Sequence, residues 1–390
     1  MHITDSGPLS RGQPGTSRAI LTFPTVISLD SGTLLATYRT GTTKDSDDET
    51  VEFVRSNDGG RTWSEPWKPV ENPTLDGLYG SLRVIYMTEL SPGHLLGASM
   101  WIDRTTWPGG GLFNEETEGC LPMQVLLADS NDEGQTWSPW RLVPMPDEIG
   151  PPSLTAPVLM LADGSLALSI ETNKHYQDAS PWMQKVVFMH CHDRQTSYSS
   201  PGQEGKLAVD PNWAEAVVAG QDPSGRIFNW DLRCGVSPDG RVATFSWTYD
   251  TATARYLNIH RRISADSGRT WTDAEDLGFA DQAARPAMLA DGRVLLPYVD
   301  RFGSRSIRAR LAPAIDAPFD PSTEVVIYSQ AQDPGDQTGS TSELLSEMSL
   351  WTFGLPYAET LADGTALVVY YAGSDETMDI HWARIDPGPA

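Results

Sequence analysis

The octamer Ser56-Asn-Asp-Gly-Gly-Arg-Thr-Trp63 recurs, nearly unchanged, at two further places in the chain. The copies are Ser130-Asn-Asp-Glu-Gly-Gln-Thr-Trp137 and Ser264-Ala-Asp-Ser-Gly-Arg-Thr-Trp271, which share the form S-x-D-x-G-x-T-W. In such a segment Ser and Asp side chains bond to nearby backbone groups, Gly takes the strained position, and Trp folds back between neighbouring sheets. Each octamer therefore predicts a tight turn. We expect a fourth, eroded copy at Cys191-His-Asp-Arg-Gln-Thr-Ser-Tyr198.

A second pattern, an apolar run followed by a Gly turn and another apolar run, occurs six times. Its turn glycines are Gly32, Gly93, Gly164, Gly240, Gly292 and Gly364. Asp-Gly or Ser-Gly supplies the positive φ that a strand-reversing turn needs, and flanks such as Val294-Leu-Leu are too short for anything but buried strands. Each copy predicts a β-hairpin. The glycines are 52 to 76 residues apart, so the repeats fill the 390 residues as one domain.

The octamers resemble the Asp-boxes of the sialidase (neuraminidase) superfamily, and the resemblance covers all the repeated units. It implies an all-β fold, a six-bladed β-propeller of four-stranded antiparallel blades over residues 1–390. Repeated short strands without helical periodicity also indicate a propeller. The last unit lacks a fourth strand, so we expect a segment within residues 1–20 to supply it and close the ring. The repeated aspartates Asp58, Asp132 and Asp266 are expected to be structural.

Composition narrows the class of partner. The chain has 28 Lys and Arg against 52 Asp and Glu, a formal charge of −24. Because nucleic-acid binding is driven by Lys and Arg, nucleic acid is excluded as a main partner. Only five of the basic residues are Lys, and Arg grips carboxylates in a planar, two-pronged way. The composition therefore favours a small molecule or oligosaccharide with hydroxyl or acidic groups.

The cysteines indicate whether the chain binds metal, and the apolar runs indicate where in the cell it is located. Cys120, Cys191 and Cys234 are too few for a disulfide framework and show no zinc-binding spacing. We expect no cofactor and no metal. The chain has no 18-residue apolar run and no leader-like N-terminus, which predicts a cytoplasmic protein without membrane contact, or a secreted mature form whose leader was removed.

Propeller topology predicts where a site would lie. If the first strand of each unit runs toward the Asp-Gly turn and the second returns, residues that open first strands and close second strands meet at one face. These positions are polar or aromatic although the strands beside them are apolar, as a sugar ring requires. The candidate substrate-binding residues are Arg39, Arg83, Trp101, Asp103, His175, Trp230, Arg233, Trp247, Arg285, Asp300, Arg301 and Arg305.

The resemblance also implies individual roles. Arg39 matches the strand-closing Arg of sialidases, and Asp45 resembles the acid/base Asp of the following loop. Asp231 stands where a Glu activates the nucleophile, Tyr357 matches the Tyr nucleophile, and Arg305 matches the last Arg of the carboxylate clamp.

Two departures from the family pattern affect that clamp. The Arg-Ile-Pro position reads Thr22-Phe23-Pro24, and the strand exit that carries a clamp Arg reads Trp247-Thr-Tyr-Asp250. A substrate carboxylate would lose charge-assisted partners, so ordinary sialic-acid cleavage is not expected.

The leading hypothesis is an exo-acting glycoside hydrolase that uses paired carboxyl groups, one protonated and one ionised. The candidate catalytic residues are Asp231, Asp45, Glu171, Tyr357, Tyr249 and Asp250. A lyase acting on uronate sugars, with Tyr249 or His175 as base and Arg301 neutralising the carboxylate, is an alternative. A non-catalytic sugar-binding propeller is another, in which Asp231 and Arg233 form a salt bridge and the tryptophans pack between blades.

Overall fold

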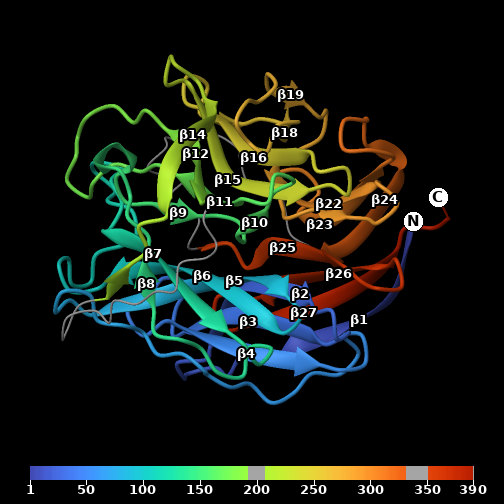
Figure 1. Ribbon diagram of the computed structural model, residues 1–390, viewed down its shortest axis with the longest axis horizontal. Coiled ribbons are helices and arrows are strands. Elements are labelled where there is room, and N and C mark those ends of the chain that lie inside the picture. Colours follow the sequence, from blue (N-terminus) through green and yellow to red (C-terminus); the bar gives the residue numbers. More distant parts are fainter. Residues whose placement is uncertain (192–206, 331–349, 390) are drawn as a thin grey trace.

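The computed structural model describes residues 1–191, 207–330 and 350–389, and no α-helix appears in these ranges. The strands form five sheets, and a single short 3-10 helix is named among the elements, η1 (Asp147–Ile149). In Figure 1 the sheets follow one another round the molecule in chain order, and the C-terminal strands return beside the N-terminal ones.

The large sheet has the strand order β25-β26-β27-β2-β3-β4, with β1 paired to β27. Its strands are β1 (His2–Ser10), β2 (Ile20–Ser28), β3 (Leu34–Gly41), β4 (Thr50–Ser56), β25 (Phe353–Thr360), β26 (Ala366–Gly373) and β27 (Met378–Asp386). Two antiparallel strand sets, β2 to β4 and β25 to β27, are joined in parallel at Ile20 and Met378. β1 runs antiparallel to β27, from His2 opposite Asp386 to Ser10 opposite Ile380. The N-terminal segment therefore provides the strand next to β27 (Figure 1).

Each of the four other sheets contains one further antiparallel strand set. The second sheet consists of β5 (Gly80–Ser91), β6 (His94–Asp103), β7 (Met123–Ser130), β8 (Arg141–Leu142) and β13 (Ala208–Val209). The third consists of β9 (Ser153–Leu154), β10 (Leu159–Met160), β11 (Leu166–Glu171), β12 (Lys185–Cys191) and β14 (Trp213–Gln221). The fourth consists of β15 (Ile227–Val236), β16 (Val242–Asp250), β17 (Arg255–Tyr256), β18 (His260–Ser264) and β19 (Glu275–Asp276). The fifth consists of β20 (Gln282–Ala283), β21 (Ala287–Met288), β22 (Val294–Asp300), β23 (Ser306–Ala312) and β24 (Asp320–Ser329).

The repeated sequence patterns form the turns expected of them. All six hairpin glycines have positive φ, between 76° and 90°. In the first octamer the Asp58 carboxylate accepts the backbone N–H of Thr62 at 2.9 Å and its hydroxyl at 2.6 Å, and the same contacts recur in the other two. Trp137 packs on Phe53 of the neighbouring strand set, with ring centroids 5.8 Å apart. The eroded copy at 192–198 lies outside the described residues.

The core runs between neighbouring strand sets. Leu21 of β2, Ala98 of β6, Leu168 of β11 and Val369 of β26 have no exposed surface and belong to one cluster. The apolar flanks of the hairpins therefore pack neighbouring strand sets against one another. No helix in the described part of the chain is long and apolar enough to cross a membrane.

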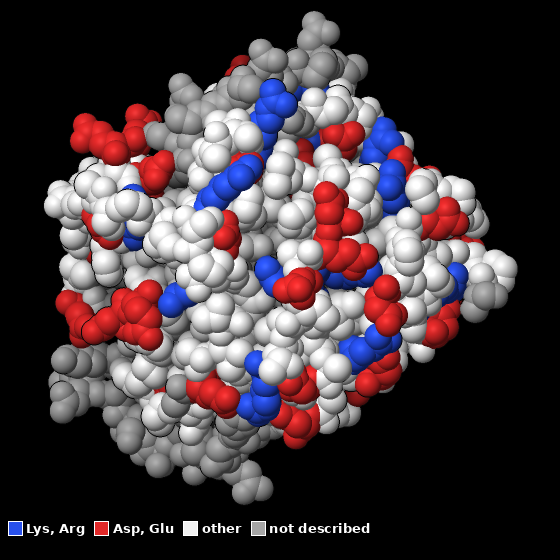
Figure 2. Space-filling model, turned by 90° about the horizontal axis from the view of Figure 1, so that it is seen from above, with Lys and Arg blue, Asp and Glu red and all other residues white. Residues whose placement is uncertain are grey.

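Charged side chains lie mostly at the surface, where acidic and basic groups stand side by side over the face shown in Figure 2. Arg241, for example, contacts both Asp239 and Asp316 at 2.8 Å. Much of the basic charge is thus paired with acidic side chains of the same chain.

Candidate active site

The first strands of four strand sets, β2, β5, β15 and β25, each contain a bulge, and we call these strands the inner strands. Strand pairing shifts register at Phe23-Pro24 of β2, Arg83-Val84 of β5, Asp231-Leu232 of β15 and Leu355-Pro356 of β25. Such a bulge re-aims a side chain out of the strand's regular alternation. The first residue of each bulge lines one and the same cavity. The inner strands therefore each deliver one side chain to a shared site.

Three of these residues have backbone strain. Phe23, Asp231 and Leu355 have φ of 51°, 45° and 44°, in the left-handed region that favours glycine. A non-glycine residue held there costs on the order of 1–3 kcal/mol and persists only when its surroundings fix it. Because such strain gathers at functional sites, these positions are candidates for ligand contact.

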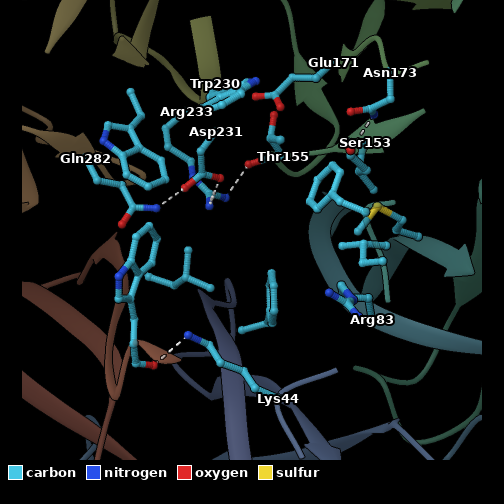
Figure 3. Close-up of a pocket in the computed structure, with 18 of the residues that line it drawn as sticks. Lys44, Arg83, Ser153, Thr155, Glu171, Asn173, Trp230, Asp231, Arg233 and Gln282 are labelled. Atoms are coloured by element: carbon cyan, nitrogen blue, oxygen red, sulfur yellow. Dashed lines mark hydrogen bonds and ion pairs between the residues drawn. The ribbon is translucent and has the colours of Figure 1, made fainter. Parts of the chain in front are cut away.

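The rest of the cavity lining comes from neighbouring positions of the first strands, from the second strands and from loops. These lining residues are Lys44, Tyr86, Met100, Leu112, Phe113, Ser153, Leu154, Thr155, Glu171, Asn173, Trp182, Trp230, Arg233, Trp247, Gln282, Arg301, Trp351 and Tyr371. Figure 3 shows polar side chains from several sheets directed at the same space. In the described ranges, no three His, Cys, Asp or Glu side chains are grouped so that they could hold a metal ion.

Asp231 is held from two sides. Gln282 donates its side-chain amide to Oδ2 at 2.7 Å, and Arg233 pairs with Oδ1 (Figure 3). The oxygen of Gln282 accepts from Arg301 at 2.5 Å, and Arg233 also donates to the Thr155 carbonyl at 2.6 Å. This network fixes the carboxylate while leaving its side chain 19% exposed to the cavity.

Glu171 lies at the end of β11, beside Asp231, and has a different environment. It is 7% exposed, and its Oε1 accepts the backbone N–H of Leu232 at 2.7 Å. Burial, together with the nearby charge of Asp231, raises the pKa of Glu171 to about 8. Glu171 therefore carries a proton at neutral pH, and one cavity holds two carboxyl groups with unlike surroundings.

Two cations share an aromatic edge of the cavity. The Arg301 guanidinium lies 3.9 Å from the centre of the Trp351 ring and donates to the Phe353 carbonyl at 3.1 Å. Lys44 donates to the Trp351 carbonyl at 2.6 Å and lies 5.1 Å from the centre of the Tyr371 ring. Burial lowers the pKa of both groups, and the charge of Arg301 further lowers that of Lys44.

Asp45 belongs to an ion-pair network next to the cavity. It pairs with Arg83 and accepts from Arg104 at 2.8 Å, while the buried Glu49 accepts from Arg39 and from Arg104 at 2.7 Å each. Burial acts to raise the pKa of Asp45, but Arg83 and Arg104 outweigh it and hold that pKa below its ordinary value. The network favours charged Asp45, whereas the proton-donating role expected from the resemblance needs the neutral form.

Some of the sequence-predicted residues meet in the cavity. These are Arg83, Glu171, Trp230, Asp231, Arg233, Trp247 and Arg301. Tyr357 lies behind the wall, 3% exposed, with its ring stacked on Tyr86 at 6.2 Å and Arg285 4.8 Å above it. Arg285 in turn pairs with Glu359 at 2.5 Å. The bulge at Leu355 brings that residue, and not Tyr357, to the cavity.

The residues expected to serve a lyase are not together. Tyr249 has no exposed surface and stacks on Trp230 at 5.1 Å, outside the lining. His175 is exposed on a loop, and it too is absent from the lining. Of this group only Arg301 reaches the cavity.

The remaining predicted residues make local contacts outside the cavity. Trp101 is 2% exposed and donates to the Pro73 carbonyl at 2.9 Å. The other contacts are Asp103 to the N–H groups of Thr105 and Thr106, Asp250 to Arg226, Asp300 to the N–H groups of Gly303 and Ser304, and Arg305 to Gln330. Some polar side chains at strand ends thus hold neighbouring loops by local hydrogen bonds, and others line the cavity. Their position in the strand does not tell which of these roles a residue has.

Sequence reasoning missed Gln282, Thr155 and Lys44. A signal for the bulges was present, since Phe23-Pro24 and Leu355-Pro356 are apolar-Pro pairs in corresponding inner strands. Proline cannot donate to a strand ladder and is confined to edges and bulges, so the pair marks where alternation breaks. No comparable sequence signal, such as a following proline, identifies Gln282 as a cavity residue.

No protein-family model matches the chain, and no curated protein matches it either. Solved structures do. A protein of unknown function from Dyadobacter fermentans is 20% identical, with a TM-score of 0.68 over 98% of this chain and 99% of that one. The intramolecular trans-sialidase from Ruminococcus gnavus, in complex with oseltamivir carboxylate, is 14% identical, with a TM-score of 0.63 over 99% and 98%. The alpha-L-arabinanase from Penicillium chrysogenum, complexed with arabinobiose, is 15% identical, with a TM-score of 0.60 over 99% of each chain. The chain thus has a sialidase-like, all-β fold over nearly its whole length.

Proposed function

We propose that this chain is a six-bladed β-propeller of the sialidase superfamily and an exo-acting glycoside hydrolase. The antiparallel strand sets are its blades, and pairing of β1 with β27 closes the ring. Similarity to structures of a trans-sialidase and an alpha-L-arabinanase, both named for action on glycans, supports the substrate class.

The placement of Glu171 and Asp231 in one cavity carries the proposal. Glu171 donates its proton to the glycosidic oxygen as the bond to the anomeric carbon breaks. Water supplies the hydroxyl that joins the anomeric carbon, and its proton is taken up by a carboxylate. Asp231, paired with Arg233, acts on the anomeric carbon either through that water or through a glycosyl intermediate.

The shape and lining of the cavity support exo action on a sugar. Residues from all five sheets surround it, an enclosure that suits one terminal unit of a glycan, whereas an interior unit needs an open groove. Trp182, Trp230, Trp247 and Trp351 offer aromatic surface for the apolar face of a sugar ring. Phe23 belongs to the Thr22-Phe23-Pro24 segment that stands where the family pattern has Arg-Ile-Pro, and Trp247 belongs to the strand exit where that pattern has another Arg, which favours a sugar without a carboxylate.

A panel of glycans analysed by mass spectrometry tests the function. Hydrolysis leaves products whose summed mass exceeds the substrate by one water. An unsaturated product that absorbs in the ultraviolet would instead indicate a lyase, and binding without any product would indicate a sugar-binding protein. Either of these outcomes would contradict the proposal, and Asp231→Asn is the matched inactive control.

A further inference from the structure

The cavity has two unlike sides. Polar groups come from the third, fourth and fifth sheets, and in Figure 3 Ser153, Thr155, Asn173, Glu171 and Asp231 lie together across the space from Lys44 and Arg83. Apolar lining residues on the other side come from β2, β6, β25 and the connection between β6 and β7. They are Phe23, Met100, Leu112, Phe113 and Leu355, which belong to one hydrophobic cluster or pack against it. A ligand that fills the cavity therefore meets hydrogen-bonding groups on one edge and hydrocarbon on the other.

The cations on the apolar side have contacts of their own. Arg83 contacts Asp45 and Glu49 through Nη2, which lies 3.2 Å from Glu49, and Lys44 donates to the Trp351 carbonyl at 2.6 Å. A hydroxyl group directed at Phe23 or Leu355 would leave water and meet hydrocarbon. A polar group buried without a hydrogen bond loses free energy, whereas a methyl group gains it on burial.

The backbone conformation of Phe23 and Leu355 supports a role for their side chains in ligand contact. Phe23 and Leu355 keep φ of 51° and 44°, where Gly or Asn is ordinarily found. Both remain partly exposed toward the cavity although they pack on the core cluster. Strain retained at a ligand-facing apolar residue indicates that the side chain itself is needed there.

We propose that the sugar bound in this cavity is a 6-deoxyhexose whose methyl group lies against Phe23 and Leu355. Its ring hydroxyls face Asp231, Gln282 and Thr155 on the polar side. This inference rests on the proposed function for the site and deepens it by naming the substrate class. The hydroxymethyl sugar of the same configuration binds at least about tenfold more weakly, because its extra hydroxyl leaves water to lie against the hydrocarbon of Phe23 and Leu355.

Matched sugar pairs test this inference. The methyl and 4-nitrophenyl glycosides, in both anomers, of rhamnose and mannose, fucose and galactose, and quinovose and glucose differ within each pair only at the sixth carbon. We expect a 6-deoxy member of at least one pair to bind at least tenfold more tightly than its partner. In saturation-transfer NMR its methyl protons receive the strongest saturation. Equal or tighter binding by the hydroxymethyl partner in every pair, or no binding of any 6-deoxy sugar, overturns the inference.

A variant at the apolar side makes the test specific. Leu355→Asn is close to isosteric and better suited to the left-handed backbone, so the fold is retained while the cavity gains hydrogen-bonding groups. We expect the preference for the 6-deoxy sugar to fall several-fold. Leu350→Asn is the control, since Leu350 is 72% exposed and lies outside this lining. An unchanged preference in Leu355→Asn overturns the inference.

The same measurements separate this inference from the proposed function. Preferential binding of a 6-deoxy sugar without turnover of any glycoside contradicts hydrolysis but supports the ligand class. Turnover of hydroxymethyl glycosides in preference to their 6-deoxy partners supports hydrolysis and overturns the ligand class.

Discussion

The side-chain amide of Gln282 donates to Asp231 at 2.7 Å and accepts from Arg301 at 2.5 Å through its oxygen. A carboxylate only accepts and a guanidinium only donates, so these two partners fix which way the amide points. Gln282 thereby links the bulge of β15 to the end of β22, and it holds the carboxylate opposite Arg233.

Replacing Gln282 with Met keeps the length of the side chain and removes both hydrogen bonds. We expect kcat/KM on the best glycan to fall about tenfold or more, because a hydrogen bond to a charged group contributes roughly 1.5–3 kcal/mol. Gln330→Met is the matched control, since Gln330 also accepts from an arginine, Arg305, but lies outside the cavity. Equal losses in the two variants would argue against a specific role for Gln282.

Asp231→Asn keeps the shape of the side chain and removes the ionisable carboxyl. We expect turnover to fall by about a thousandfold, within the range for a group that takes part in proton transfer or nucleophilic attack, while the protein still folds. Asp250→Asn is the comparison, because Asp250 is paired with Arg226 outside the cavity lining. Activity lost in Asp250→Asn but kept in Asp231→Asn would reverse the assignment.

The fold could be predicted further than the site because its signals are local. The hairpin glycines and the octamers act within a few residues, and both form the expected turns. The site depends on register. Tyr357 matches the family pattern in sequence, yet the bulge at Leu355-Pro356 shifts the alternation and Leu355 reaches the cavity. A shift of one residue exchanges the two faces of a strand, and sequence spacing does not record it.

Gln282 illustrates what no single strand can show. Its partners Asp231 and Arg301 come from the fourth and fifth sheets, and their meeting depends on how the sheets pack. Asp231 could be proposed because it is a charged residue within an otherwise mostly apolar and aromatic strand. Thr155 and Lys44 lie in segments that connect strands. The path of such a segment depends on how the sheets pack, so the sequence alone does not place these residues at the cavity.

Glu171 makes stability depend on pH. Its pKa is raised from 4.5 to about 8, so between these values the folded state binds a proton that the unfolded state releases. This contribution therefore falls as pH rises from about 4.5 to 8, by a few kcal/mol in order of magnitude. Chemical denaturation across that range should show a smaller decline for Glu171→Gln than for the wild type. Parallel curves for the two proteins would show that Glu171 is not protonated in the folded state.

The strand β1 should be needed for stability. It pairs with β27 from His2 to Ser10 and covers an edge that would otherwise carry unpaired backbone groups. Deleting residues 1–18 also removes the ion pair of Arg18 with Glu52, at 2.9 Å. We expect the melting temperature to fall by roughly 5 °C or more. An unchanged melting temperature would show that β1 does not stabilise the fold.

Sialic acid should be a poor ligand for this cavity. The Phe23 ring, next to Thr22 where the family pattern has arginine, lies 5.5 Å from the Arg39 guanidinium and 5.6 Å from that of Arg83. Trp247, at the second such position, stacks on Tyr256 at 4.1 Å. A sialic-acid carboxylate thus loses two charge-assisted partners, each contributing on the order of 1.5–3 kcal/mol, which together weaken binding by about a hundredfold or more.

We therefore expect little release from a fluorogenic sialoside and weak inhibition by the dehydrated sialic-acid analogue that mimics the flattened transition state. Phe23→Arg adds one positive charge to the cavity wall and serves as the comparison, since improved binding of that analogue would show that the missing charge is the barrier. Efficient sialoside cleavage by the wild type would contradict this prediction. It would require the cavity arginines Arg83, Arg233 and Arg301 to bind the carboxylate in a different arrangement, with Arg83 and Arg233 released from the carboxylates they now contact.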